Sequence, residues 1–124
     1  SHQATEATWD LLSRRKPPTA LFSSNARCSI GVVPALQGRG RTDIALVGYG
    51  DFPLASALRP ALTVIDQNPD ALGEAAATRL FQGLDNPSRR TKRLTVLPVR
   101  LLVRASCAAA QDHQHVTMAG HLAT

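Results

Sequence analysis

The sequence is poor in several features that would place it in a special class of protein. Only 4% of its 124 residues are aromatic, and it contains two cysteines. Its apolar runs fall well short of the roughly 18 residues that a membrane-spanning helix needs, so we expect no membrane partner. The first residues do not form a charged-then-apolar leader either.

Groups of residues typical of catalysis or metal binding are also scarce. Cys28 and Cys107 lack the spacing of metal ligands, and two reduced thiols in a cytosolic protein are favoured over a disulfide, although pairing stays open. No serine stands in a G-x-S-x-G elbow, and Gly48-x-Gly50 lacks the third glycine of a dinucleotide site. We therefore predict no enzyme, no cofactor and no metal site.

Acidic residues are fewer than basic ones, 9 against 14, which gives a net charge of +5 and a pI near 10.2. Such a balance can indicate a nucleic-acid surface. However, four of the basic residues cluster at 89–93 with no aromatic residue between them for base stacking. We interpret this cluster as a solvated loop.

The length and the 44% apolar content suit one domain with its own core. Residues 108–124 have no hydrophobic period, and we predict a mobile tail. The histidines in this stretch, His113, His115 and His121, are interpreted as solvated side chains, with stray metal binding as the alternative.

Hydrophobic periodicity and turn residues predict alternating helices and strands. Helices are expected over residues 4–15, 25–36 and 69–84, and strands over residues 19–23, 43–47, 62–65, 94–97 and 101–103. Pro34 should kink the second helix or end it early. The third helix should bury one face, made of Leu72, Ala76, Leu80 and Leu84. This alternation predicts an α/β fold with a mainly parallel sheet flanked by helices.

Polar residues follow three of the predicted strands. Asn25 follows the first, Gly50 and Asp51 follow the second, and Gln67 follows the third. Because the carboxyl ends of parallel strands meet at one edge of a sheet, we predict a ligand pocket there. A helix cap is an equally good interpretation of Asn25, and a hinge hydrogen bond alone is an equally good interpretation of Gln67.

Five motifs occur in order along the chain, and each resembles a motif of LacI/GalR-type transcriptional regulators. They are Pro18–Asn25 (P-T-A-[IV]-[FV]-x-x-N), Val47–Asp51 (V-G-[YF]-D-D), Leu62–Gln67 (L-T-[TS]-[VI]-x-Q), Leu72–Ala76 (L-G-x-x-A) and Leu97–Ser106 (L-P-x-x-L-[VI]-x-R-x-S). The resemblance covers residues 4–107 and concerns the effector-binding domain of that family.

The resemblance implies an incomplete periplasmic-binding-protein-like (type I) lobe over residues 1–107. Residues 1–66 and about 99–107 would belong to the second lobe, and about 68–98 to the first. It further implies a cytoplasmic homodimer that binds a small, sugar-like effector, and that contacts operator DNA only through an amino-terminal headpiece absent from this chain. The alternative is a periplasmic solute-binding protein of a sugar transporter.

Two pocket positions depart from the family pattern. The asparagine that helps to line the pocket is usually followed by aspartate, but here Ala26 follows Asn25. The aspartate nearest the strand in V-G-[YF]-D-D is replaced by Gly50, which offers only backbone groups. The resemblance also implies a dimer surface at Ile30, Gly31, Val33, Leu54 and Leu58, although a core role explains Ile30 and Val33 equally well.

Overall fold

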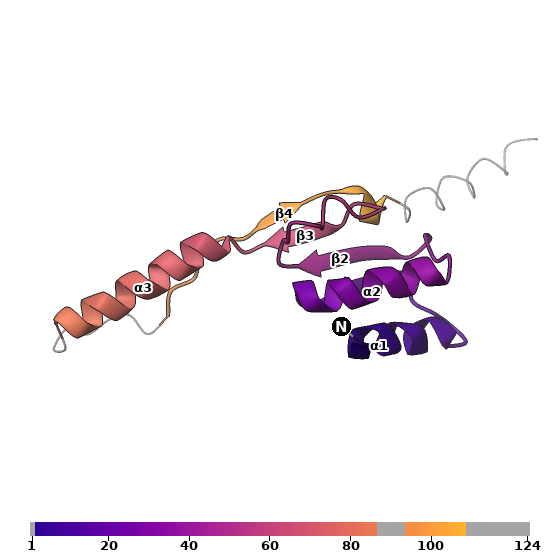
Figure 1. Ribbon diagram of the computed structural model, residues 1–124, viewed down its shortest axis with the longest axis horizontal. Helices are drawn as coiled ribbons and strands as arrows, with labels where there is room; N and C mark the ends of the chain where they lie inside the picture. Colours follow the sequence, from indigo (N-terminus) through magenta and orange to yellow (C-terminus); the bar gives the residue numbers. More distant parts are fainter. Residues whose placement is uncertain (1, 87–93, 109–124) are drawn as a thin grey trace, which may run out of the picture.

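The computed structural model describes residues 2–86 and 94–108 (Figure 1). Its elements are α1 (His2–Ser13), β1 (Ala20–Ser23), α2 (Ala26–Gly38), β2 (Ala45–Tyr49), β3 (Thr63–Asp66), α3 (Pro69–Asp85), β4 (Arg100–Leu102) and a short 3-10 helix, η1 (Ala105–Cys107). The predicted tail at 108–124, with its three histidines, lies outside the described residues apart from Ala108, as does the basic cluster at 89–93.

The four strands form one sheet in the order β1-β2-β3-β4. β1, β2 and β3 are parallel, whereas β4 runs antiparallel to β3. The predicted α/β fold with a mainly parallel sheet is therefore confirmed.

The core lies between the sheet and α2. Leu46 and Val64 from the sheet, together with Leu62 just before β3, pack with Val32 and Leu36 from α2, among other residues. α1 lies beside α2 (Figure 1), and the Thr5 hydroxyl donates a hydrogen bond to the carbonyl oxygen of Gly31 at 3.0 Å. This packing fixes the start of α2 relative to the strand ends.

Pro34 does not end α2. The helix continues to Gly38, four residues past the proline. Proline removes the backbone donor that would bond the carbonyl of Ile30, and its ring crowds that carbonyl. Ile30 and Pro34 are both exposed, so water can satisfy that carbonyl and the helix tolerates the loss.

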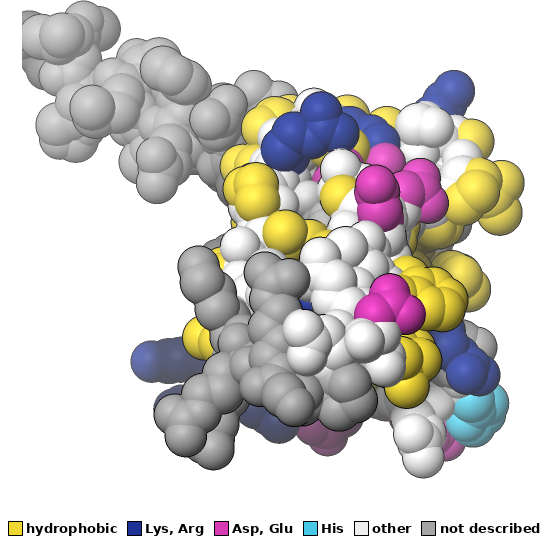
Figure 2. All heavy atoms as spheres, turned by 90° about the vertical axis from the view of Figure 1, so that its left-hand side faces the viewer, with side chains coloured by type: hydrophobic (Ala, Val, Ile, Leu, Met, Phe, Trp, Pro, Cys, Tyr) yellow, Lys and Arg dark blue, Asp and Glu magenta, His cyan; other side chains and the backbone are white. Residues whose placement is uncertain are grey.

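The predicted burial of the α3 face is wrong for this chain. α3 has no buried residue, and it projects away from the sheet in Figure 1. The predicted strand at 94–97 is also absent, since residues 94–99 form no strand. A strand needs a neighbouring strand to satisfy its backbone groups, and within the described residues nothing pairs with this segment. Figure 2, which faces the side from which α3 projects, shows exposed hydrophobic side chains.

Candidate functional site

The predicted site residues lie at one edge of the sheet. The parallel strands β1, β2 and β3 end at Ser23, Tyr49 and Asp66, and the residues that follow share this edge. A Cβ atom added to Gly50 would lie 3.4 Å from Gln67 Oε1 and 3.9 Å from the backbone nitrogen of Ala26. The start of α2, Gly50 and Gln67 therefore lie close together at this edge, and their binding of a ligand stays a prediction.

Asn25 caps α2. Its side-chain oxygen accepts a hydrogen bond from the backbone N–H of Cys28 at 2.9 Å, and its own backbone is extended. This bond satisfies one of the donors that a helix leaves unpaired at its start. The capping role that the sequence left open is thus present.

Gly50 and Gln67 form the centre of the edge. Gly50 has φ of +86°, a conformation that favours glycine, and its N–H donates to the carbonyl of Ile65 at 2.8 Å. Gln67 Oε1 is buried and accepts no hydrogen bond from the residues that the structure describes. A buried acceptor without a partner costs free energy, so a donor group of a ligand placed here would be stabilised.

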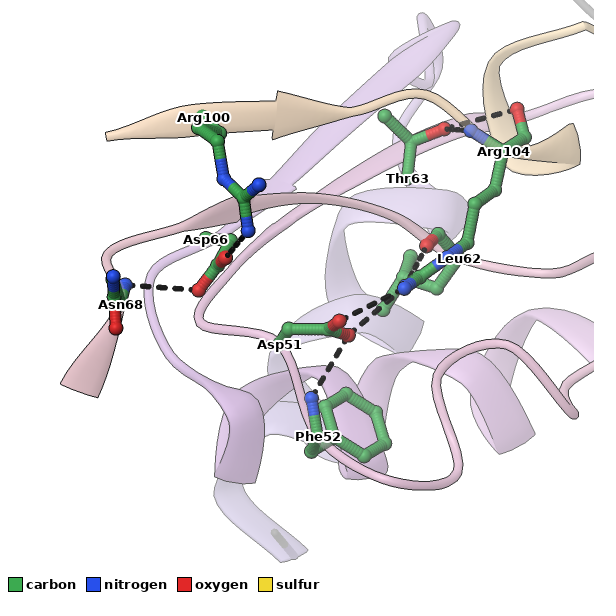
Figure 3. Close-up of polar contacts among 8 residues, drawn as sticks. All are labelled: Asp51, Phe52, Leu62, Thr63, Asp66, Asn68, Arg100 and Arg104. Carbon is green, nitrogen blue, oxygen red and sulfur yellow. Dashed lines mark hydrogen bonds and ion pairs between the residues drawn. The ribbon is translucent and has the colours of Figure 1, made fainter. Parts of the chain in front are cut away.

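Asp51 is paired within the chain (Figure 3). Its two carboxylate oxygens accept hydrogen bonds from Arg104 Nη1 and Nη2 at 2.9 and 2.8 Å. One of these oxygens also accepts from the N–H of Phe52 at 3.0 Å. The Arg104 guanidinium lowers the pKa of Asp51 below its ordinary value, and the bond from Phe52 adds to this effect. Sequence reasoning gave Arg104 no role at this edge.

A second ion pair joins the two segments that run between the sheet and α3. Arg100 on β4 donates to Asp66 at the end of β3 at 3.0 Å, and the N–H of Asn68 donates to the other Asp66 oxygen at 2.9 Å (Figure 3). The bond from Asn68, and then that from Arg100, lower the pKa of Asp66. The chain therefore leaves and re-enters the sheet at one fixed point.

The lowered pKa of Asp51 predicts loss of stability in acid. A group with a depressed folded-state pKa stabilises the fold above its unfolded value, near 3.9 for aspartate, and this stabilisation is lost as pH falls through the folded pKa. Asp51→Asn should therefore reduce the fall in urea midpoint between about pH 5 and 3. Arg104→Gln removes the main cause of the shift and should flatten the profile similarly. If the urea midpoint fell with pH as steeply in both variants as in the wild type, the Asp51–Arg104 pair would not be a cause of the acid sensitivity.

Comparison with known proteins identifies the chain. The model of the family "periplasmic binding protein-like domain" matches residues 1–107. The chain belongs to this family. It is 38% identical over 104 residues to the ribose operon repressor of Escherichia coli, an alignment that covers 82% of this chain and 31% of that protein. It is 33% identical to the lactose operon repressor of Klebsiella pneumoniae, covering 88% of this chain and 32% of the relative.

Solved structures of LacI-family regulators share the fold. A LacI family transcriptional regulator from Enterococcus faecium with bound ribose is 26% identical, with a TM-score of 0.73, and the match covers 83% of this chain and 38% of that one. The lac repressor dimer bound to operator and an anti-inducer is 30% identical, with a TM-score of 0.72, over 84% and 32% of the two chains. The chain thus spans about a third of the length of these regulators and corresponds to part of their effector-binding domain.

The family's dimer surface, as the resemblance implies it, falls on residues of different burial. Ile30 and Leu54 are exposed, at 50% and 64%, whereas Val33 is in the core. Gly31 is buried and bonded to α1, and Leu58 is partly buried against the core. In this chain only Ile30 and Leu54 present exposed side chains at the predicted surface.

Other chemistry is limited in the described ranges 2–86 and 94–108. They hold no group of three or more histidine, cysteine or acidic residues that could bind a metal ion. No helix within them is long and apolar enough to cross a membrane. Cys28 and Cys107 are free thiols, both partly buried.

Proposed function

We propose that this chain is the carboxy-terminal part of the effector-binding and dimerisation domain of a LacI-family, DNA-binding transcriptional regulator. The observation that carries the proposal is the convergence of Gly50, Gln67 and the start of α2 at the carboxyl edge of the parallel sheet. This group lies beside the ion pair of Asp66 and Arg100, where the chain leaves the sheet for α3 and returns from it. The similarity to ribose and lactose operon repressors supports a sugar-like effector.

We assign the chain to two lobes. Residues 1–66 and about 99–107 form the second lobe, and residues 68–98 contribute α3 and the segment 94–98 to the first. The exposed apolar side chains of α3 and this segment support the assignment, since they need a covering sheet. Arg79 Nη1 donates to the Thr95 hydroxyl at 2.8 Å and holds the segment against α3.

The mechanism that follows is a two-state equilibrium between lobe arrangements. An effector bound between the lobes favours one arrangement and so changes the spacing of two DNA-binding headpieces in a dimer. Because both nearby aspartates are paired with arginines, we expect the effector to be bound mainly by Gln67, backbone groups and the amide nitrogen of Asn25.

The test uses the gene product that carries this chain. Its binding to a palindromic operator-like duplex is measured by fluorescence anisotropy, with and without D-ribose or lactose. A sugar-dependent change in affinity for the operator, absent for a shuffled duplex, supports the proposal. Sugar binding by a protein without any duplex preference would favour the alternative, a solute-binding protein of a transporter. Turnover of the sugar would contradict the proposed absence of enzyme activity.

The 124-residue chain alone should not recognise operator DNA. Sequence-specific proteins of this kind read bases with a recognition helix in the major groove. We place that helix in the headpiece, so operator and random duplexes should bind this chain with equal, weak and salt-sensitive affinity. A titration at physiological salt checks this, and an operator preference of about tenfold or more would contradict it.

We further propose that the protein is a cytoplasmic homodimer with Ile30 and Leu54 in the contact. Both side chains are exposed, so charging them has little cost in the monomer. Ile30→Glu combined with Leu54→Glu should therefore yield monomers in light scattering while leaving the melting temperature nearly unchanged. The matched control is Leu72→Glu with Leu80→Glu on α3, since a dimer abolished only by that pair would place association on the α3 face instead.

A further inference from the structure

Arg104 reaches the candidate site from the far end of the chain. It follows β4, whose register with β3 is antiparallel, and its backbone N–H donates to the Thr63 hydroxyl at 2.9 Å. The same hydroxyl donates to the carbonyl oxygen of Arg104 at 3.0 Å. Thr63 is buried at 2% exposure, so the backbone of Arg104 is fixed on the first residue of β3.

The side chain of Arg104 connects β3 to the loop after β2 (Figure 3). Besides its two bonds to Asp51, Arg104 Nη1 donates to the carbonyl of Leu62 at 3.0 Å. The side chains of Arg104 and Asp51 are only 20% and 31% exposed. Planar, two-point pairing of this kind fixes both orientation and distance, unlike a single bond from a flexible cation.

Asp51 lies between two neighbours that have restraints of their own, Gly50 just after β2 and Phe52, whose side chain packs against the core and whose carbonyl accepts from the N–H of Ala55 at 2.9 Å. Gly50 is held by its N–H bond to Ile65 and has no side chain, and the N–H of Phe52 bonds back to Asp51 itself. The bond between Gly50 and Ile65 therefore sets where Gly50 lies relative to Gln67, and the Asp51–Arg104 pair holds the side chain of the next residue against the start of β3.

We propose that Arg104 is a positioning residue for loop 50–52, and that Asp51 anchors this loop to β3 instead of contacting the effector. The binding of an effector at this site rests on the proposed function, but the anchoring of the loop can be measured without a ligand. The site is then divided chemically, with Gln67 and backbone groups proposed to face the ligand and the Asp51–Arg104 pair holding the loop that follows Gly50.

The experiment measures amide hydrogen exchange by NMR in the full 124-residue chain. Arg104→Gln should speed exchange of the Gly50 and Phe52 amides by roughly tenfold, while amides within α2 change little. Asp51→Asn should act in the same direction, and the double variant should exceed the larger single effect only slightly, since both remove one interaction. Arg104→Lys keeps the charge but not the two-point geometry, so it should restore protection only in part.

The matched control is Arg41→Gln. Arg41 makes an equally short two-point pair with Asp43, at 2.7 and 2.8 Å, near the opposite end of β2. Its loss should leave the Gly50 and Phe52 amides unaffected. The proposal would be overturned if the Gly50 and Phe52 amides exchanged at the same rate in the Arg104→Gln and Arg41→Gln variants. It would also be overturned if Arg104→Gln accelerated the exchange of all amides evenly.

Titration of the gene product that carries this chain with D-ribose, followed at the Gly50 amide and the Gln67 side chain, separates this inference from the proposed function. If the wild type binds, Arg104→Gln and Asp51→Asn should weaken binding by similar factors. A much larger loss in Asp51→Asn would show that Asp51 contacts the sugar and would overturn its role as an anchor. Absence of wild-type binding would count against the proposed function, and the exchange results would still decide the inference.

Discussion

Replacing Gly48 with alanine is expected to lower the free energy of unfolding by about 2–3 kcal/mol, the range expected for overpacking a well-filled core. A Cβ atom at Gly48 would lie 2.9 Å from Ser29 Oγ, 3.2 Å from Leu62 Cδ2 and 3.3 Å from Ser23 Oγ. The serine hydroxyls cannot simply turn away, because they are hydrogen-bonded to each other at 2.6 Å and are buried. Relief would therefore break this bond or displace the Leu62 side chain.

Urea denaturation of Gly48→Ala measures the effect, and Gly73→Ala in α3 is the matched control. Apart from residue 73, its chain neighbours and the nearby backbone of its own helix, no heavy atom of the described residues lies within 4 Å of the position where a Cβ of residue 73 would stand. Alanine there should stabilise the chain by about 0.5–1 kcal/mol, because it restricts the unfolded backbone more than glycine does. If the two variants changed stability in the same direction, the close packing at Gly48 would be disproved.

Gly48 also shows what local sequence can and cannot predict. The apolar run and the glycine predicted a strand from 43 to 47 closed by Gly48, whereas β2 spans Ala45–Tyr49. Glycine has no side chain that favours a strand, so it resembles a strand end. The serines that make glycine necessary come from β1 and α2, and this proximity exists only in the folded chain.

Periodicity predicted the position of α3 well and its environment badly. The expected range 69–84 agrees with Pro69–Asp85, and Asn68 caps the helix as its type suggests. A four-residue repeat shows that a helix has an apolar face, but it does not identify what covers that face. Here the described part of the chain supplies no cover, so Leu72 and Leu80 are exposed.

The site was predictable to the extent that it depends on topology. Parallel strands end at one edge, which was enough to place Gly50 and Gln67 together. The pairing of Asp51 with Arg104 spans 53 positions and has no local signal. Arginines flank the apolar run 101–103 on both sides, at positions 100 and 104, and the local sequence does not show which of them pairs with Asp51.

Ser106→Ala is expected to destabilise the fold by about 2–3 kcal/mol, since it leaves the Thr63 N–H without its partner and the Leu46 carbonyl with only the weak contact of the Cys107 thiol at 3.8 Å. The Ser106 hydroxyl donates to the carbonyl of Leu46 at 2.5 Å and accepts from the N–H of Thr63 at 2.8 Å. It thereby bridges β2 and β3 next to the point where their pairing begins, at Val47 and Thr63. Ser106 is 4% exposed, so water cannot replace the hydroxyl without opening the structure.

Ser24→Ala provides the control for this prediction. Ser24 is exposed, and its hydroxyl makes only a long contact of 3.9 Å with Cys28 Sγ. Its removal should change stability by less than about 0.5 kcal/mol, as at most surface positions. The urea midpoints of the two variants give the comparison directly when the free energy of unfolding depends equally steeply on urea in both. A loss in Ser106→Ala no larger than that in Ser24→Ala would mean that η1 does not hold β2 and β3 together, and that the sheet closes through its backbone pairing alone.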